Sequence, residues 1–508
     1  MNNIFKNTIL FQYRMAWLSS LSIVLGILIF SLPLSAQKTL TLDNAILLAR
    51  QNSPDAVIAK TKLKNGYWQY RTFKANYFPT LTLDVTTPDL SRALTKITLP
   101  TGDDAFVQRN LISNMAKLSL SQQVFTGGTI AVVSSLQRLD ILNPNNPFSS
   151  PLSHSFLATP AGLSFTQPVF GFNGFKWSKK IEPMKYKIAK RQYAQDIEDI
   201  SLTTVDLFYN LLVAQSNLQI AQKNKANNDT IYNISVGRYN LGKLAENDLL
   251  QIKLNMLNAD LAVQEANMEV ASAAGSFKSY LGMKLADSIS LMLTEAQDSA
   301  EINLAEAWAQ AQHNSVRSLN NDEKQVESQQ AIAYAKGTNG FRGNLYAAYG
   351  LNQSAGQFTG VYDRPEQQQQ VNLGLTLPIL DWGRARGVIE TAKAANMVTE
   401  ATIKKDNVDF EQEIYLQVTR YNLQKTRLRL SKSADEVADR RYFIAKARYM
   451  IGKIDLTDLN IAQNERDNAR RNYIESMRTY WKTYFGLRRA TLYDFKEKKL
   501  LEEDIKVY

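Results

Sequence analysis

The distribution of proline sets the strongest limit on how this 508-residue chain folds. Prolines recur up to Pro183, but none lies between Pro183 and Pro365, and none follows Pro378. Because proline breaks helix interiors, the proline-free segments can form very long helices. Residues 384–450 contain one glycine, Gly387, and as a continuous helix they would span about 100 Å. No ordinary globular domain holds such a helix, so we expect an elongated, coiled-coil-like packing.

Apolar residues in these segments recur at spacings of three and four, with charged and amide side chains between them. Ile414, Val418 and Tyr421 illustrate this spacing. It predicts helices with a narrow apolar stripe and wet outer faces. The predicted helices cover residues 43–76, 176–241, 247–286, 303–337, 384–450 and 457–487. We expect Pro54 to open a new helical turn within the first of them.

The N-terminus has the pattern of an export signal. Lys6 and Arg14 precede an apolar run over residues 15–33, and small residues follow it up to Ala36. This order is typical of a secretory signal peptide, predicted here as residues 1–36. A signal anchor is the alternative, because the run approaches the length of a membrane span. The rest of the sequence has no apolar run of that length, so we do not expect the exported protein to cross a membrane by helices.

Six segments between the helices alternate apolar and polar residues, which is the period of a β-strand. The clearest is VNLGLTLPI (371–379), in which every second residue is Val, Leu or Ile. The others are residues 81–85, 118–125, 129–137, 162–170 and 344–351. Each alone fits a soluble sandwich with one wet face as well as a transmembrane barrel. Six such segments beside an export signal favour the barrel.

An internal repeat with an offset of 210 residues (448 − 238) divides the chain. RYNLGK (238–243) recurs as RYMIGK (448–453), and Asp248 recurs as Asp458. This predicts two copies of one unit made of a helix, strands, a long helix, a turn and a returning helix. The first copy is predicted over residues 37–290, with strands within 77–172 and helices over 176–286. The second is predicted over 291–490, with strands within 341–380 and helices over 384–487, followed by a C-terminal tail, 491–508.

The order and spacing of several motifs resemble the TolC family of outer-membrane efflux channels. These motifs are LTLDNAILLARQNSPD (40–55), NYFPTLTL (76–83), FTQPVFGF (165–172), LTLPILDWGRARGVIE (375–390) and the two RY-x-x-GK motifs. The resemblance runs from about Leu40 to Leu487. It implies an α+β membrane protein, in which a long α-helical barrel of coiled-coil hairpins continues into a trimeric outer-membrane β-barrel.

The same resemblance implies function and partners. It implies a homotrimer in outer-membrane lipid that serves as a passive exit duct in a tripartite efflux or type I secretion system. A periplasmic adaptor (membrane fusion protein) and an inner-membrane transporter would engage it, and no cofactor or enzyme activity is implied.

The family normally has two strands per repeat, whereas residues 77–172 offer four. Because lipid does not tolerate open sheet edges, three copies must together close twelve strands, or eighteen if the hairpin 117–138 also inserts.

The two RY-x-x-GK motifs are predicted to be turns between long helices. The first also matches most of a phosphate-binding loop, but Leu244 stands where that loop needs a hydroxyl. In the second motif the first glycine of such a loop is replaced by Ala447, which disfavours nucleotide binding further. Gly242 and Gly452 instead suit the left-handed residue that ends a helix.

The returning helices carry the candidate gate. Asn247 and Thr457 suit their N-caps, which would place Asp248 and Asp458 in the first turn, where the helix dipole favours an acid. Family gates resemble acidic rings on the second returning helix, and Asp458 matches the first such position. The second acidic position is Ile461 here, which departs from the family pattern. We hypothesise that Asp458, together with Asp248, lines a closed periplasmic aperture; helix capping alone is the alternative.

The turns are also the candidate docking site for the adaptor. We expect contact through two glycines and the apolar residues after the turns, with basic neighbours that steer the partner. The candidate residues are Arg238, Gly242, Lys243, Leu244, Arg448, Gly452, Lys453 and Ile454.

Composition excludes several other functions. The chain has no cysteine and only two histidines, His154 and His313, which disfavours thiolate or histidine metal sites and Cys- or His-based hydrolysis. The formal net charge is +11, but basic residues are scattered among acidic ones along the helices, so nucleic acid is not an expected partner. The main alternative is a periplasmic coiled-coil adaptor or envelope scaffold, which would share the hairpins and lack lipid-facing strands.

Overall fold

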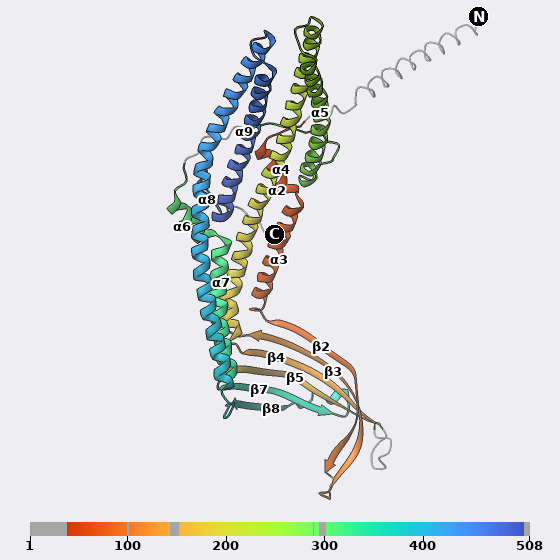
Figure 1. The fold of residues 1–508 in the computed structure, drawn as a ribbon. Helices are drawn as coiled ribbons and strands as arrows, with labels where there is room; N and C mark the ends of the chain where they lie inside the picture. The colour runs from red at the N-terminus through yellow and green to blue at the C-terminus, as the bar shows by residue number, and fades with distance from the viewer. Residues whose placement is uncertain (1–37, 99–100, 143–151, 288, 294–300, 502–508) are drawn as a thin grey trace, which may run out of the picture. The chain divides into compact units, whose positions relative to one another are not determined.

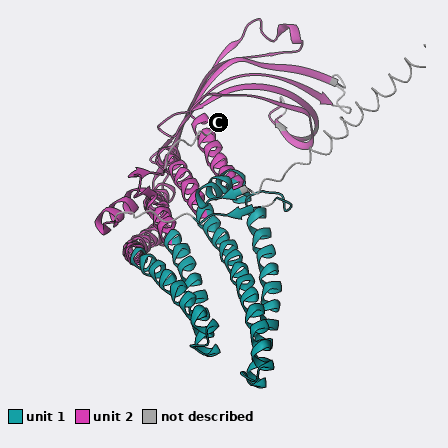
Figure 2. Cartoon of the chain, turned by 90° about the horizontal axis from the view of Figure 1, so that it is seen from above, with its two compact units in different colours: residues 1–56, 200–298, 424–482 teal, residues 57–199, 299–423, 483–508 magenta. Residues whose placement is uncertain are grey.

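The computed structural model describes residues 38–98, 101–142, 152–287, 289–293 and 301–501. The predicted signal peptide, residues 1–36, lies outside this part of the chain. The chain divides into two compact units, each built from three separate segments (Figure 2). Unit 1 comprises residues 1–56, 200–298 and 424–482, and unit 2 comprises residues 57–199, 299–423 and 483–508.

Unit 2 contains an antiparallel sheet of six strands in the order β2-β3-β4-β5-β7-β8 (Figure 1). The strands are β2 (Thr80–Thr98), β3 (Asp104–Gln123), β4 (Thr129–Leu142), β5 (Leu152–Val169), β7 (Arg342–Ala355) and β8 (Glu366–Thr376). All six segments predicted from alternation fall on strands, although β8 ends at Thr376, three residues before the end of the predicted segment 371–379. The hairpin 117–138 belongs to the same sheet, because β3 pairs with β4 and β4 with β5. The outer strands of the sheet are β2 and β8.

Strand β2 is much longer than the alternation in residues 81–85 predicted. It runs to Thr98 in spite of Pro88, because the register with β3 shifts between Thr86 and Asp89. Proline has no N–H to donate, so within sheets it is confined to edge strands and bulges. Strand β2 offers both, and the proline is absorbed without ending the strand.

The long predicted helices are present. Helices α4 (Gly174–Asn240) and α8 (Arg384–Met450) have 67 residues each, and α8 begins and ends at the predicted residues. The returning helices are α5 (Glu246–Tyr280) and α9 (Leu456–Thr491), with 35 and 36 residues. No helix in the described part of the chain has the length and hydropathy needed to cross a membrane.

Shorter helices precede each group of strands. They are α2 (Leu42–Asn52), α3 (Pro54–Ala75), α6 (Leu304–Asn314) and α7 (Val316–Asn339). Pro54 opens α3 as predicted, but the prediction of one helix over residues 303–337 was wrong. Ser315 interrupts it with an extended backbone, and its hydroxyl accepts a hydrogen bond from the Ser318 N–H at 3.1 Å. A serine that offers the backbone this alternative partner favours a cap over a helix interior.

The described residues beyond α9, 492–501, belong to unit 2. Strands β9 (Tyr493–Asp494) and β10 (Lys499–Leu500) pair with each other. The Arg488 guanidinium contacts the Asp494 carboxylate at 2.8 Å and the Glu198 carboxylate at 3.0 Å, and both acids are almost fully buried. Because a buried charge without a partner is costly, this triad ties the segment around Asp494 to α4.

Candidate functional site

One face of the sheet carries apolar side chains that line up from strand to strand. Leu81 of β2 lies opposite Leu120 of β3, and the row continues through Val132, Leu163 and Tyr349. These five side chains are between 41% and 62% exposed. A contiguous apolar surface of this kind is typical of a face that meets an apolar partner or lipid.

The opposite face of the sheet is polar and small. The next row of paired residues consists of Thr80, Ser121, Ala131, Ser164, Ala348 and Gln370. Strands that are apolar on one face and polar on the other are the pattern of membrane barrels, in which one face meets lipid and the other meets water. The register therefore aligns the alternating residues of neighbouring strands, so that the sheet has two chemically distinct faces.

The two predicted turns have nearly the same geometry. Gly242 and Gly452 have φ angles of 68° and 73°, in the left-handed region that favours glycine. At the first turn the Lys243 N–H donates to the Arg238 carbonyl at 2.9 Å, and at the second Lys453 does the same to Arg448 at 2.9 Å. These bonds, closed over a left-handed glycine, form the Schellman motif that ends a helix.

The caps of the returning helices differ from the prediction. Ala245 and Asp455 precede α5 and α9, so Asn247 and Thr457 are not the N-caps. Asp455 accepts a hydrogen bond from the Asp458 N–H at 2.8 Å, whereas Ala245 offers no side-chain acceptor. An N-cap carboxylate reaches the free N–H three residues later, which a residue inside the first turn cannot do.

The candidate gate residues lie where predicted in the chain. Asp248 and Asp458 are in the first turns of α5 and α9, and both side chains are exposed. Two further carboxylates that the sequence analysis missed are exposed here: Glu246, two residues before Asp248, and Asp455, three residues before Asp458. The signal for Asp455 was present, since an Asp directly before the first apolar residue of a helical pattern, here Leu456, is typical of an N-cap.

The two hairpins of unit 1 pack together through an apolar cluster, which we call the tip cluster. Its buried members are Ile231, Ile252, Tyr442, Tyr449, Leu459 and Ala462, and Tyr232, Leu244, Ala445, Ile454 and Leu456 pack against them. They come from α4, α5, α8, α9 and the two turns. Leu244 and Ile454, two candidate docking residues, thus direct their side chains into contacts between the hairpins.

Polar contacts reinforce the tip cluster. The Arg238 guanidinium donates to the Met450 carbonyl at 3.2 Å and lies 5.8 Å from the centre of the Tyr449 ring. Asn227 donates to the Tyr442 hydroxyl at 2.8 Å, and burial raises the pKa of that phenol. The first hairpin therefore contacts the second through a charged donor as well as apolar packing.

The remaining candidate docking residues are exposed: Gly242, Lys243, Arg448, Gly452 and Lys453. Two apolar residues that the sequence analysis missed accompany them. Leu241 and Ile451 precede the turn glycines and are 72% and 66% exposed. Their signal was an apolar residue at the same position of both RY-x-x-GK motifs. Each turn thus presents an apolar side chain beside a lysine.

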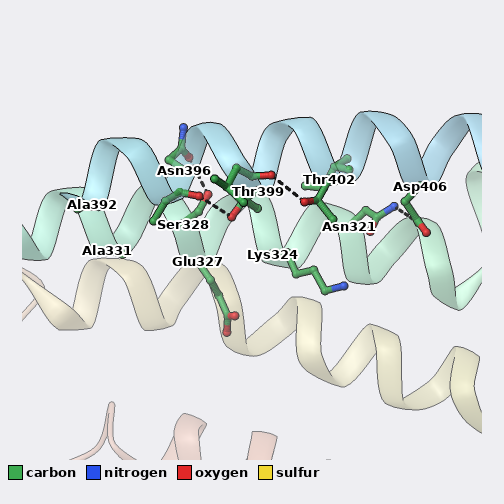
Figure 3. Close-up of a pocket in the computed structure, with 13 residues that line it drawn as sticks. Asn321, Lys324, Glu327, Ser328, Ala331, Ala392, Asn396, Thr399, Thr402 and Asp406 are labelled. Atoms are coloured by element: carbon green, nitrogen blue, oxygen red, sulfur yellow. Dashed lines mark hydrogen bonds between the residues drawn. The ribbon is translucent and has the colours of Figure 1, made fainter. Parts of the chain in front are cut away.

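A groove between α7 and α8 is lined mostly by short side chains, several of which are hydrogen-bonded across the two helices (Figure 3). Ser328 donates to Asn396 at 2.7 Å, and Asn321 donates to Asp406 at 2.8 Å. Hydrogen bonds from Arg317 hold the pKa of Asp406 below its usual value. These bonds join two helices. In the described residues, no group of His, Asp or Glu is arranged to hold a metal ion.

Comparisons with known proteins agree with this geometry. A sequence model of the outer membrane efflux protein family matches residues 147–283 and 344–491, more than half of the chain. The Campylobacter jejuni CmeC outer membrane channel is similar in structure, with a TM-score of 0.64 and 17% identity, over 92% of this chain and 88% of that one. The outer membrane protein VceC from Vibrio cholerae has a TM-score of 0.60 and 14% identity, over 89% and 95%.

A third solved structure, the open state of the Neisseria gonorrhoeae MtrE outer membrane channel, has a TM-score of 0.58 and 12% identity, over 89% of this chain and 88% of that one. No curated protein matches the sequence. At these identities the structural likeness shows the fold, and the family match shows membership. The chain belongs to the outer membrane efflux protein family: it is a TolC-like channel protein of the outer membrane with a long periplasmic helical part.

Proposed function

We propose that three copies of this chain form a passive exit duct of a tripartite efflux or type I secretion system. The observation that carries the proposal is the two-faced sheet, whose apolar face suits lipid and whose polar face suits a water-filled lumen. The long helices form the periplasmic part, where an adaptor and an inner-membrane transporter dock. The chain supplies a path and carries out no chemistry.

The division into two copies, residues 37–290 and 291–490, belongs to this proposal. Corresponding helices have nearly equal lengths: 67 residues in α4 and α8, 35 and 36 in α5 and α9, and 11 in α2 and α6. The copies differ in their strands, since the first supplies β2 to β5 and the second only β7 and β8.

Reconstitution tests the duct. We expect the protein extracted from outer membranes to migrate as a trimer that heating converts to monomers, and to conduct ions in a planar bilayer. A periplasmic adaptor or scaffold would give neither result. A protein that stays monomeric before heating and leaves the bilayer unchanged would refute the duct.

The gate proposal concerns Asp458 and Asp248. Because Asp455 caps α9, the Asp458 carboxylate is not needed as a cap and remains exposed. On a three-fold axis, three such carboxylates would repel one another and attract cations. We expect Asp458→Asn to weaken cation block of the closed pore several-fold and Asp248→Asn to weaken it less. Unchanged cation block in Asp458→Asn, with Asp455→Ala as the control for a lost cap, would remove Asp458 from the gate.

The adaptor proposal uses the exposed residues of the turns. Because the chain has no cysteine, single cysteines serve as clean probes. We expect crosslinks to the co-purified adaptor from Lys243→Cys, Lys453→Cys and Ile451→Cys, and none from Ile454→Cys, whose side chain packs against the tip cluster. Crosslinks absent from all three exposed positions would move the docking site elsewhere. The transporter that co-purifies with the complex would identify the class of substrate.

A further inference from the structure

The two outer strands of the sheet are complementary edges. Within the described residues β2 pairs only with β3, and β8 only with β7, so each leaves one row of backbone N–H and C=O groups without a strand. Strand β2 follows α3 into the sheet and β8 leads out of it toward α8, so the two run in opposite directions. An antiparallel pair between two chains would therefore continue the pattern of every other pair in the sheet.

The stagger of the sheet sets the register of such a pair. Residues that lie opposite one another, followed from Leu81, lead through Leu120, Val132, Leu163 and Tyr349 to Gln369. Leu81 is the second residue of β2, whereas the second residue from the end of β8 is Leu375. If the helix-proximal ends of both strands are level, the stagger per chain is six residues, from 369 to 375.

We propose that β2 of one chain pairs with β8 of the next copy with Leu81 opposite Leu375. Leu83 then lies opposite Leu373 and Val85 opposite Val371, so the apolar face continues across the seam. On the polar face, Thr82 lies opposite Gly374 and Asp84 opposite Asn372. This rests on the proposed trimer and adds to it: all six strands of each chain take part, so the barrel closes with eighteen strands rather than the twelve expected from two strands per repeat.

Neighbouring registers fit less well. A shift of one residue places Leu81 opposite Gly374 or Thr376 and exchanges the two faces of the sheet. A shift of two in one direction places Val85 opposite Gln369 on the apolar face. A shift of two in the other direction moves the partner of Leu81 to residue 377, beyond the end of β8 at Thr376.

The resulting barrel also has a normal geometry. A stagger of six residues for six strands, with the usual spacings along and between strands, corresponds to a strand tilt of about 35°. Membrane barrels tilt their strands by roughly 35–45° and have even strand numbers that include eighteen. Barrels of this size leave an aqueous channel, whereas small barrels fill with side chains. The register derived from one chain is thus compatible with closure by three.

Paired cysteines test the register directly, since the chain has none of its own. Two matched double variants are Leu81→Cys with Leu375→Cys, and Thr82→Cys with Gly374→Cys. Each pair lies on a different face, so both types of cross-strand pair are sampled. We expect oxidation, or a short thiol crosslinker, to convert most of at least one matched variant into covalent trimers that survive boiling.

The control uses the same four cysteine substitutions, paired in the other combination. The mismatched variants are Leu81→Cys with Gly374→Cys, and Thr82→Cys with Leu375→Cys, which place the thiols on opposite faces in the proposed register. We expect at least ten-fold less covalent trimer from them. Preferential linkage of the mismatched variants would overturn the register. Heat-modifiable, conducting trimers with no β2-to-β8 linkage would overturn the seam and leave the duct standing, whereas loss of both trimer and conductance in the parent protein would refute the duct itself.

Discussion

The two helical turns of unit 1 have the same backbone and different surroundings. Tyr449 before the second turn is 7% exposed, whereas Tyr239 at the equivalent position of the first turn is 39% exposed. Arg238 reaches from the first hairpin to the Met450 carbonyl and the Tyr449 ring, but Arg448 is exposed. Local sequence therefore determines the turn, and the neighbouring hairpin determines what each side chain does. The first hairpin supplies the cation, and the second supplies the buried ring.

The largest expected difference lies in the two tyrosines. Tyr449→Ala leaves a cavity in the tip cluster and should lower its local stability by about 3 kcal/mol. Tyr239→Ala removes an exposed ring and should change it by about 0.5 kcal/mol or less. Hydrogen exchange of peptides that cover residues 440–460 measures both. Equal exchange rates in the two variants would show that the turns are equivalent.

Substitution of the two arginines should also destabilise one hairpin contact more than the other, by a smaller difference in free energy than for the tyrosines. Arg238→Ala removes one hydrogen bond and a cation–ring contact, and should destabilise the contact between the hairpins by about 1–2 kcal/mol. Arg448→Ala is the matched control and should leave the contact intact. If the tip cluster also restrains a gate, Arg238→Ala raises the open probability in bilayers and Arg448→Ala does not. An effect of Arg448→Ala as large as that of Arg238→Ala would contradict the asymmetry.

Substitution of the two turn glycines should have equal effects, because the two turns share the same backbone geometry. A β-carbon added at Gly242 or at Gly452 would point into open space, with no neighbouring side chain within 4 Å, so alanine meets only the strain of the left-handed backbone. That strain is about 1–2 kcal/mol at each site. Proteolysis rates at the two turns should therefore rise by similar factors in Gly242→Ala and Gly452→Ala. A large difference between them would point to a contact that only one turn makes.

Substitutions at the two helix caps should have the smallest effects on stability, and the two effects should have opposite signs. Asp455→Ala removes the acceptor for the Asp458 N–H and should destabilise the start of α9 by about 1 kcal/mol. Ala245→Asp supplies the missing acceptor at the start of α5 and should stabilise it by about 0.5 kcal/mol. Amide exchange in the first turn of each helix reports both. Slower exchange in Asp455→Ala, or faster exchange in Ala245→Asp, would contradict this assignment of the caps.

Sequence periodicity predicted the elements well where one local rule operates. The absence of proline allowed a helix as long as α8, whose predicted bounds 384–450 are those observed, and period-two alternation located all six strands of the sheet. Prediction from periodicity failed where a single residue changes the local hydrogen bonding of the backbone. Ser315 breaks a helical pattern by accepting a backbone hydrogen bond, and Pro88 is tolerated because β2 is bulged at that position.

The candidate site was predictable only in part. The glycines, lysines and acids of the turns were found because they recur at a fixed offset. The burial of Tyr449 and the inward packing of Leu244 and Ile454 depend on contacts between hairpins that lie far apart in the sequence, which no local pattern encodes. The strand register likewise follows from the pairing of whole strands, and only that register turns six alternating segments into two chemically distinct faces.

The open edges of β2 and β8 have a consequence for how the protein is made. A newly exported chain that folded alone would present two strands with free backbone groups beside a broad apolar face, a combination that drives aggregation. If several copies close the barrel as proposed, the lone folded chain is an aggregation-prone intermediate in the periplasm. Its yield should depend on holding chaperones and on the encounter of copies, so that overproduction without matching chaperone capacity leads to precipitation rather than to more channels.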